Sequence, residues 1–164
     1  MAIDSYINDL EFDFDGFYAQ IKALVMARMA KLVKDKEFTT KITFLPLDAR
    51  NLSKTQTPAI TLDISYTPYE AAMDSFQVNN SSDVTLQFDV YTSGENAKRN
   101  NIVLRSKIAQ ELIKIQTSGA YRFLGMNIDD NTFVNSIING VTRGVLRMSC
   151  VVDNYNKVIQ KRRM

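Results

Sequence analysis

The acidic residues of this chain are the first candidates for chemistry, because carboxylates can bind metal ions or transfer protons. Asp129 and Asp130 are adjacent, and adjacent side chains point apart in an extended chain. We therefore interpret them as turn residues rather than as a metal-binding or acid–base pair. A second acidic segment has alternating carboxylates like those of a calcium loop. It lacks the central glycine and the terminal glutamate of such a loop, so we do not interpret it as a calcium site. That segment contains Asp9, Glu11, Asp13 and Asp15.

The nucleophiles and proton carriers of common enzymes are also scarce. The chain has no histidine and one cysteine, although histidine is the side chain most used for proton transfer near neutral pH. Cys150 falls on the apolar side of a predicted strand, so we expect it to pack in the core. The glycines form no phosphate-binding pattern. We expect no enzymatic activity, no metal and no cofactor, and a function that resides in surfaces.

Length and composition favour one domain over residues 1–164. The chain has a mass of 18.6 kDa and 45% hydrophobic residues, which is ample for one core. Residues 1–82 carry 11 acidic and 8 basic side chains, and residues 83–164 carry 7 acidic and 12 basic ones. The ends are a possible N-terminal arm over 1–12 and a basic tail over 155–164. A basic tail can bind nucleic acid or an anionic membrane, but a solvated tail is the commoner case.

The sequence shows no targeting or membrane segment. The N-terminus is acidic and lacks the basic and apolar regions of a signal peptide. No stretch approaches the roughly 20 apolar residues that span a bilayer. We therefore expect a soluble, cytosolic chain without membrane contact.

Apolar spacing predicts two helices. The first spans about 15–34 and is capped by Asp13 or Asp15. The second follows a capping box in which Thr92 is the cap and Glu95 reaches back, and it ends near Gln116. The apolar stripes contain Phe17, Ile21, Leu24, Val25, Met29 and Leu32 in the first helix and Ala97, Leu104, Ile108, Leu112 and Ile115 in the second. The basic residues that we place on the solvated face of the second helix are Lys98, Arg99, Arg105, Lys107 and Lys114.

Alternating residues predict strands over 40–44, 58–66 and 84–91. Their apolar rows contain Ile42 and Phe44, then Ile60, Leu62, Ile64 and Tyr66, then Val84, Leu86, Phe88 and Val90. The connection over 67–82 is either a hairpin with longer strands or a projecting loop. In the second case its apolar side chains would contact a neighbouring chain. Those candidates are Tyr69, Met73 and Phe76.

Two more strands complete the pattern. In the first, Arg122, Leu124, Met126 and Ile128 share one side, and residues 129–131 form a turn. Residues 139–140 favour a hairpin, although residues 133–138 also fit one helical turn. In the closing strand the core side contains Leu146, Met148, Cys150 and Val152, whereas Arg143 and Arg147 face away. The predicted fold is α+β, with helices packed on one face of a mixed or antiparallel sheet in the order α-β-β-β-α-β-β.

This element order, together with two short motifs, resembles the tail terminator (tail completion) proteins of long-tailed bacteriophages. The first motif is the strand-to-helix junction over Phe88–Thr92, followed by a polar turn and a helix that begins near Ala97. The second is the closing strand over Arg143–Asp153. The resemblance covers nearly the whole chain as a pattern.

The resemblance implies a structural virion protein that assembles in the host cytoplasm and is located in the tail or neck. Such proteins form a ring, commonly of six copies, which caps the head-proximal end of the tail tube and stops its polymerisation. Its partners would be further copies of itself, the tail tube protein and a head-completion or connector protein. DNA would pass through the ring without specific binding.

A ring with a repeated contact needs two unlike surfaces on each subunit. We predict that the acidic segment and the basic end form one such pair, and that the aromatic loop supplies apolar contacts. Arg143, Arg147, Lys161, Arg162 and Arg163 are the basic candidates. The alternatives are another neck or head–tail joining protein, or a small nucleic-acid-binding module that uses Arg143, Arg147 and the tail. An enzyme is the third and most distant alternative.

Overall fold

The computed structural model describes residues 14–36, 38, 41–45, 57–68, 81–118, 121–134 and 140–154. The possible arm over 1–12 and the basic tail over 155–164 lie outside these residues. Within them the chain forms two helices, α2 (Phe14–Lys34) and α3 (Ala97–Ile113). The strands are β1 (Thr43–Phe44), β2 (Ala59–Pro68), β3 (Ser81–Ser93), β4 (Thr117–Ser118), β5 (Tyr121–Phe133) and β6 (Val141–Asn154).

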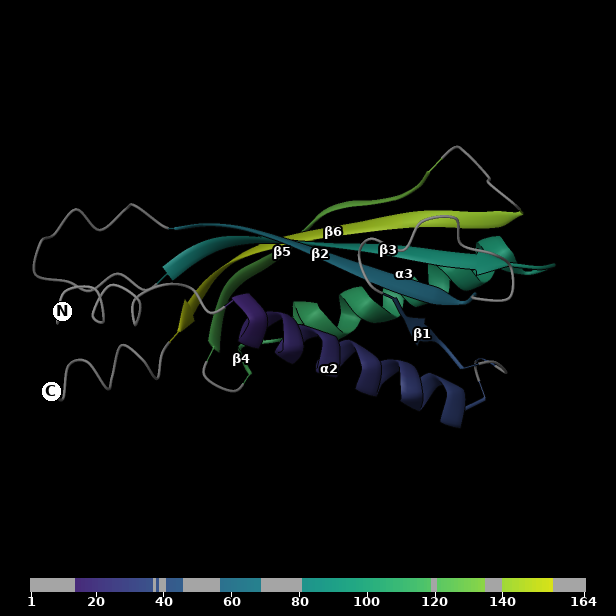
Figure 1. Cartoon of the computed structure of the whole chain (residues 1–164), viewed down its shortest axis with the longest axis horizontal. Coiled ribbons are helices and arrows are strands. Elements are labelled where there is room, and N and C mark those ends of the chain that lie inside the picture. Colours follow the sequence, from purple (N-terminus) through teal and green to yellow (C-terminus); the bar gives the residue numbers. More distant parts are fainter. Residues whose placement is uncertain are drawn as a thin grey trace, which may run out of the picture.

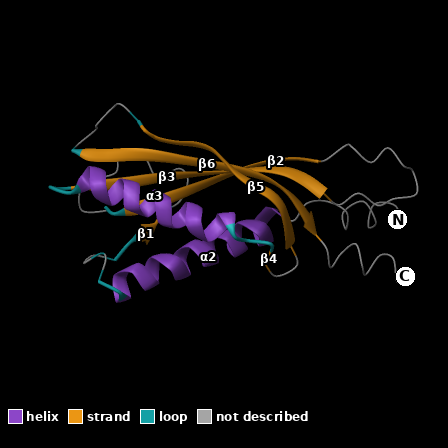
Figure 2. Cartoon of the chain, turned by 180° about the vertical axis from the view of Figure 1, so that it is seen from behind, coloured by secondary structure: helices purple, strands orange, loops and turns teal. Residues whose placement is uncertain are grey.

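The strands form one mixed sheet in the order β1-β2-β3-β6-β5-β4. The four long strands pair antiparallel with one another, and the two-residue β1 pairs parallel with β2 at the edge of the sheet. Both helices lie on one face of this sheet, as the two opposite views in Figures 1 and 2 show. The predicted α+β fold and its element order are confirmed, with β4 as an additional two-residue strand.

The core lies between the helices and the inner face of the sheet. The inner rows of β2, β3 and β6 are buried as their alternation predicts, apart from Tyr66, which is exposed at the end of β2. On α2 the buried positions follow the predicted stripe, with Leu24 only half-buried. The two-residue period of the strands specifies this core, because shifting a strand by one residue would turn its apolar row toward the solvent.

The start of α3 differs from the predicted capping box. Strand β3 continues to Ser93, the N-cap residue is Asn96, and its side chain makes no capping hydrogen bond. The Thr92 hydroxyl instead donates to the Ala97 carbonyl oxygen at 2.6 Å. The capping-box prediction is therefore wrong, because Thr92 is held in the sheet and cannot turn toward the helix amides. Helix α3 also ends at Ile113, before the predicted Gln116.

Strand β5 is the second correction. It continues through residues 129–131, so the predicted turn there is wrong. Its register against β6 shifts between Leu124 and Asn127 and again between Ile128 and Asp130. These irregularities accommodate extra residues without ending the strand. The core side at its start is Tyr121 and Phe123, both buried, whereas Leu124 is exposed on the opposite side.

The sequence analysis predicted a hairpin at residues 139–140 and offered a hairpin as one alternative for residues 67–82. Strands β5 and β6 are antiparallel neighbours, as a hairpin requires. Residues 135–139 lie outside the described part of the chain, so the choice between a turn at 139–140 and a helical turn stays a prediction. Strands β2 and β3 also pair antiparallel, up to Pro68 with Ser82. Both run slightly further than their sequence patterns indicate. Residues 69–80 lie outside the described part of the chain, so the projecting-loop alternative stays a prediction.

Cys150 is buried on the inner face of β6, as predicted. Burial, with a smaller effect from the charge of Asp83, raises the pKa of its thiol from an ordinary value of 9.0 to about 12. We expect no reaction of the native protein with a thiol reagent at pH 8 and one reactive thiol per chain in denaturant. Between pH 9 and 12 the unfolded thiol ionises first, so the free energy of unfolding falls with rising pH. Rapid modification of the native thiol would contradict this assignment.

Candidate interaction surfaces

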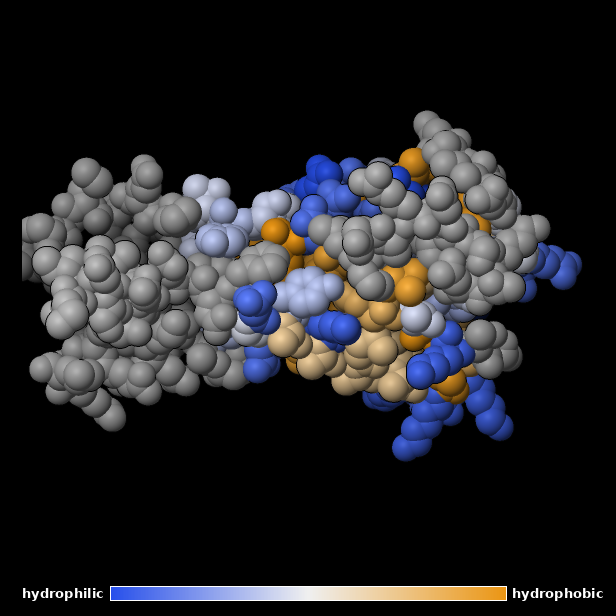
Figure 3. Space-filling model, in the orientation of Figure 1, coloured by the Kyte–Doolittle hydropathy of each residue, from blue (hydrophilic) through white to orange (hydrophobic). Residues whose placement is uncertain are grey.

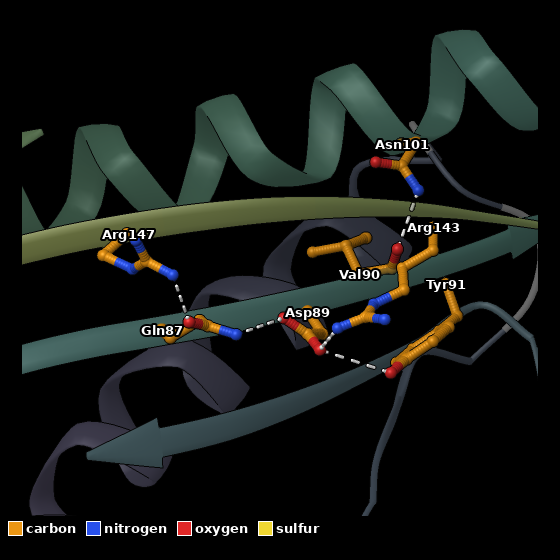
Figure 4. A network of polar contacts seen from close by, with 7 residues as sticks. All are labelled: Gln87, Asp89, Val90, Tyr91, Asn101, Arg143 and Arg147. Carbon is orange, nitrogen blue, oxygen red and sulfur yellow. Dashed lines mark hydrogen bonds and ion pairs between the residues drawn. The ribbon is translucent and has the colours of Figure 1, made fainter. Parts of the chain in front are cut away.

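The outer face of the sheet carries a line of polar side chains across β3 and β6 (Figure 4). Arg143 forms an ion pair with Asp89 at 2.6 Å, and Arg147 donates to the Gln87 side-chain oxygen at 2.8 Å. Gln87 donates in turn to Asp89 at 3.2 Å, and the Tyr91 hydroxyl donates to the same carboxylate at 3.4 Å. The register explains these contacts, because Gln87 lies opposite Arg147 and Tyr91 lies opposite Arg143.

This outer line is already paired within the chain. Asp89 is buried on the face opposite the helices, as are Thr61 and Val145, the residues directly opposite it on the two neighbouring strands. Burial, and then the negative charge of Asp89, raises the pKa of Tyr91, while the charge of Arg143 opposes the rise. Because the arginine side of these contacts is partly exposed and screened by solvent, their main effect is to order the two arginines.

The other strands of this face are paired in the same way. Arg122 forms an ion pair with Asp153 at 2.6 Å, between directly opposite positions of β5 and β6. The Ser149 hydroxyl donates to Asp129 at 3.0 Å. The outer face is therefore a polar surface with internal partners for several of its charges.

Three of the predicted interface residues lie in the described part of the chain. Arg143 and Arg147 share the outer face of β6, where each donates to a side chain of β3. Asp15 lies apart from them, exposed in the first turn of α2. The remaining candidates lie outside the described residues, and their interface role stays a prediction. They are Asp9, Glu11, Asp13, Tyr69, Met73, Phe76, Lys161, Arg162 and Arg163.

The inner face of the sheet is contacted by a buried polar cluster of α3, which the helical periodicity did not predict. Arg105 was expected on the solvated face of α3, but only 3% of its surface is exposed, and Asn101, one turn earlier, is fully buried. The Asn101 amide donates to the carbonyl oxygens of Val90 at 2.8 Å and Thr142 at 3.3 Å. Its oxygen accepts a bond from Arg105 Nε at 2.8 Å. We call these two residues the Asn101–Arg105 cluster.

The guanidinium of Arg105 reaches from α3 to the end of β5. It donates to the Asn131 side-chain oxygen and lies over the Phe133 ring, 4.6 Å from its centroid. No carboxylate of the described residues forms an ion pair with it. Burial lowers the pKa of Arg105, and the charge of Asp130 opposes this effect. Neutral amide oxygens and an aromatic face therefore stabilise this cation.

Gly144 makes room for this cluster. In the sheet it lies between Val90 of β3 and Phe133 of β5. A methyl group on Gly144 would lie less than 3.0 Å from Asn101 Oδ1 and from Arg105 Nε. The missing side chain leaves the gap that the two polar side chains fill.

Large apolar side chains are exposed along α3 and β5, which contact each other. We call this surface the α3–β5 flank. Its members are Ile102 (49% exposed), Ile113 (45%), Ile128 (47%) and Phe133 (36%). The sequence analysis missed this surface because it assigned apolar residues only to the core stripe of α3 and did not ask which apolar residues remain outside it. The available signal was the pair Ile102 and Ile113, which lie outside the predicted stripe of α3.

The described residues offer no group of three or more metal-ligating side chains, and neither described helix is long and apolar enough to cross a membrane. No model of a known protein family matches the chain, and no curated protein matches it significantly.

Proposed function

We propose that this chain is a structural subunit of a bacteriophage tail or neck. In this proposal it forms a ring that caps the head-proximal end of the tail tube, stops tube polymerisation and joins the tail to the head connector. The choice of this assembly rests on the resemblance to tail terminator proteins, which covers the element order and the junction over Phe88–Thr92.

The observation that supports self-assembly most directly is the α3–β5 flank. Contiguous apolar surfaces usually mark contacts with other proteins, whereas single exposed apolar side chains are common on monomers. The members of the flank lie on two elements that contact each other. Four of the six exposed large apolar residues of the described chain belong to this flank. A subunit whose function is assembly accounts for them without further assumptions.

The alternative of a nucleic-acid-binding module has less support. Its two sheet candidates, Arg143 and Arg147, donate to Asp89 and Gln87 rather than projecting as unpaired cations. A phosphate would have to compete with these internal acceptors. Nucleic-acid binding through the sheet face would therefore be weaker than binding to two arginines that have no internal partners.

The proposal predicts concentration-dependent rings. We expect sedimentation velocity to show an oligomer that grows with protein concentration, and negative-stain images to show rings alone and at one end of purified tail tubes. A chain that stays monomeric at every accessible concentration and does not bind tube ends would contradict the proposal. Strong salt-dependent DNA binding by the monomer would favour the nucleic-acid alternative.

A further inference from the structure

We propose that the end of β5 pairs with β6 in two registers and that Arg105 of α3 selects between them. In the observed register Arg105 donates to the Asn131 side-chain oxygen. In a register shifted by one residue it donates to Asp130 instead. Both registers belong to a single copy of the chain, so this inference does not depend on the proposed assembly.

The first register shift of β5 is determined by the residue type at one position. It lies between Leu124 and Asn127, and the segment contains Gly125 with a φ of 67°. Glycine adopts this left-handed conformation without steric cost, and such a glycine is a standard way to form a bulge. The Asn127 side chain also donates to the Gly125 carbonyl oxygen at 2.8 Å. The register of β5 just after this bulge is therefore fixed locally.

The second register shift has no such residue. Between Ile128 and Asp130 the strand takes up one extra residue, Asp129. None of residues 126–133, all of which the structure describes, is a glycine or has a positive φ. Residues 127–132 are polar except Ile128, so an apolar alternation does not specify the register there. Side-chain contacts must therefore hold this second bulge.

The consequence of losing the second bulge can be read from the register. β5 would continue in the register that it has at Ile128, and Asp130 would lie opposite Leu146, where Asn131 lies now. Each one-residue shift turns a side chain to the other face of the sheet. Asp130 would therefore leave the outer face and turn toward α3, where it would meet Arg105 in place of Asn131.

Phe133 changes face in the opposite sense. In the observed register it lies opposite Gly144, on the side of α3, with the Arg105 guanidinium 4.6 Å from its ring centroid. In the shifted register it would lie opposite Arg143 on the outer face. The register therefore decides whether the α3–β5 flank includes Phe133.

The charges of the outer face do not decide between the registers. Asp130 lies opposite Arg147 in the observed register, with Asp129 beside it in the bulge. In the shifted register Asp129 would take the position opposite Arg147. The Ser149 hydroxyl, which donates to Asp129 at 3.0 Å, lies on the same face. One aspartate therefore faces Arg147 in either register. Figure 3 shows hydrophilic side chains gathered along the upper edge of the molecule, where β5 and β6 run in Figure 1.

The choice depends on what faces the buried guanidinium of Arg105. The observed register offers the amide oxygen of Asn131 and an aromatic ring, whereas the shifted register offers a carboxylate. A carboxylate accepts a stronger hydrogen bond than an amide, but burying an ion pair carries a desolvation cost. Asp130 already lies close enough for its charge to oppose the lowering of the Arg105 pKa by burial. Because these effects oppose each other, a change of one acceptor is enough to shift the equilibrium.

Two pairs of cysteines report the register in a Cys150→Ala background, which lacks the native thiol. Thr132→Cys with Val145→Cys joins positions that are directly opposite in the observed register. Val134→Cys with Thr142→Cys joins positions that are opposite only in the shifted register. Opposite positions of antiparallel strands lie within reach of a disulfide. The masses of the monomers after mild oxidation give the fraction that is cross-linked within one chain.

The decisive variant is Asn131→Ala, which removes the acceptor of the observed register and keeps Asp130. We expect the ratio of shifted to observed cross-link to rise at least about fivefold, as the loss of one buried hydrogen bond implies. Asn131→Asp places a carboxylate at the present acceptor position, so its ratio should not exceed that of the parent protein. Phe133→Leu removes the ring but keeps an apolar side chain, and it should raise the ratio in the same direction as Asn131→Ala.

A double variant tests the role of Asp130. Asp130→Ala combined with Asn131→Ala leaves no acceptor for Arg105 in either register, so the rise seen with Asn131→Ala should disappear. Circular dichroism and urea unfolding show which variants retain the fold. If neither Asn131→Ala nor Phe133→Leu raises the ratio in a folded protein, Arg105 does not select the register and the inference is wrong. A rise that persists without Asp130 would also contradict it, because Asp130 would not be the alternative acceptor.

Discussion

Gly144→Ala is expected to lower the free energy of unfolding by about 2–5 kcal/mol. The added methyl group would overlap Asn101 Oδ1 and Arg105 Nε, which cannot move freely because both residues are buried. If Asn101 shifts, the carbonyl oxygens of Val90 and Thr142 lose its amide, and Arg105 loses an acceptor. Equilibrium denaturation in urea measures the loss directly.

Two further variants isolate the cause. Gly125→Ala meets no atom within 4 Å but occupies a position with a φ of 67°, so it measures the backbone penalty alone, about 1–2 kcal/mol. In the Asn101→Ala background one of the two obstructing side chains is absent, while Arg105 remains. The effect of Gly144→Ala should then be smaller than in the wild type, with a coupling energy of about 0.5–3 kcal/mol. A Gly144→Ala protein as stable as the wild type would contradict the close approach.

Ile108→Ala should also be strongly destabilising, by about 2–5 kcal/mol. Ile108 is fully buried, and α3 packs on β3 and β6. Its removal would leave a cavity between the helix and the sheet that the surrounding side chains fill only in part.

Ile113→Ala is the matched control for this substitution. It makes the same chemical change in the same helix, but Ile113 is 45% exposed, so we expect a change within about 0.5 kcal/mol. Equal effects for the two substitutions would mean that α3 does not bury the face described here.

Burial in the sheet could be predicted from the sequence where apolar and polar residues alternate regularly along a strand. In β3 the apolar residues from Val84 to Val90 alternate with polar ones, and this row faces the core, so the period fixes which apolar side chains are buried. In β5 the two register shifts break this alternation, and pattern reading therefore assigned a turn to residues that remain in the strand.

Arg105 shows why the polar interior could not be predicted. A basic residue on an amphipathic helix is usually solvated, and nothing local to α3 distinguishes Arg105 from Lys107. Its burial depends on Gly144, Asn131 and Phe133, which come from strands much later in the chain. For the candidate surfaces the sequence located Arg143 and Arg147 on the outer face, but it could not show that neighbouring strands already supply their partners.

The position of β6 has a consequence for how the protein is made. This strand is the last of the sheet in chain order, yet it lies between β3 and β5. A nascent chain can form α2, the β2–β3 hairpin and α3 before β6 leaves the ribosome, but the inner row of β3 then lacks its neighbour. Collapse of the full sheet must therefore wait until residues 141–154 have been synthesised, and folding is completed by contacts between distant parts of the chain.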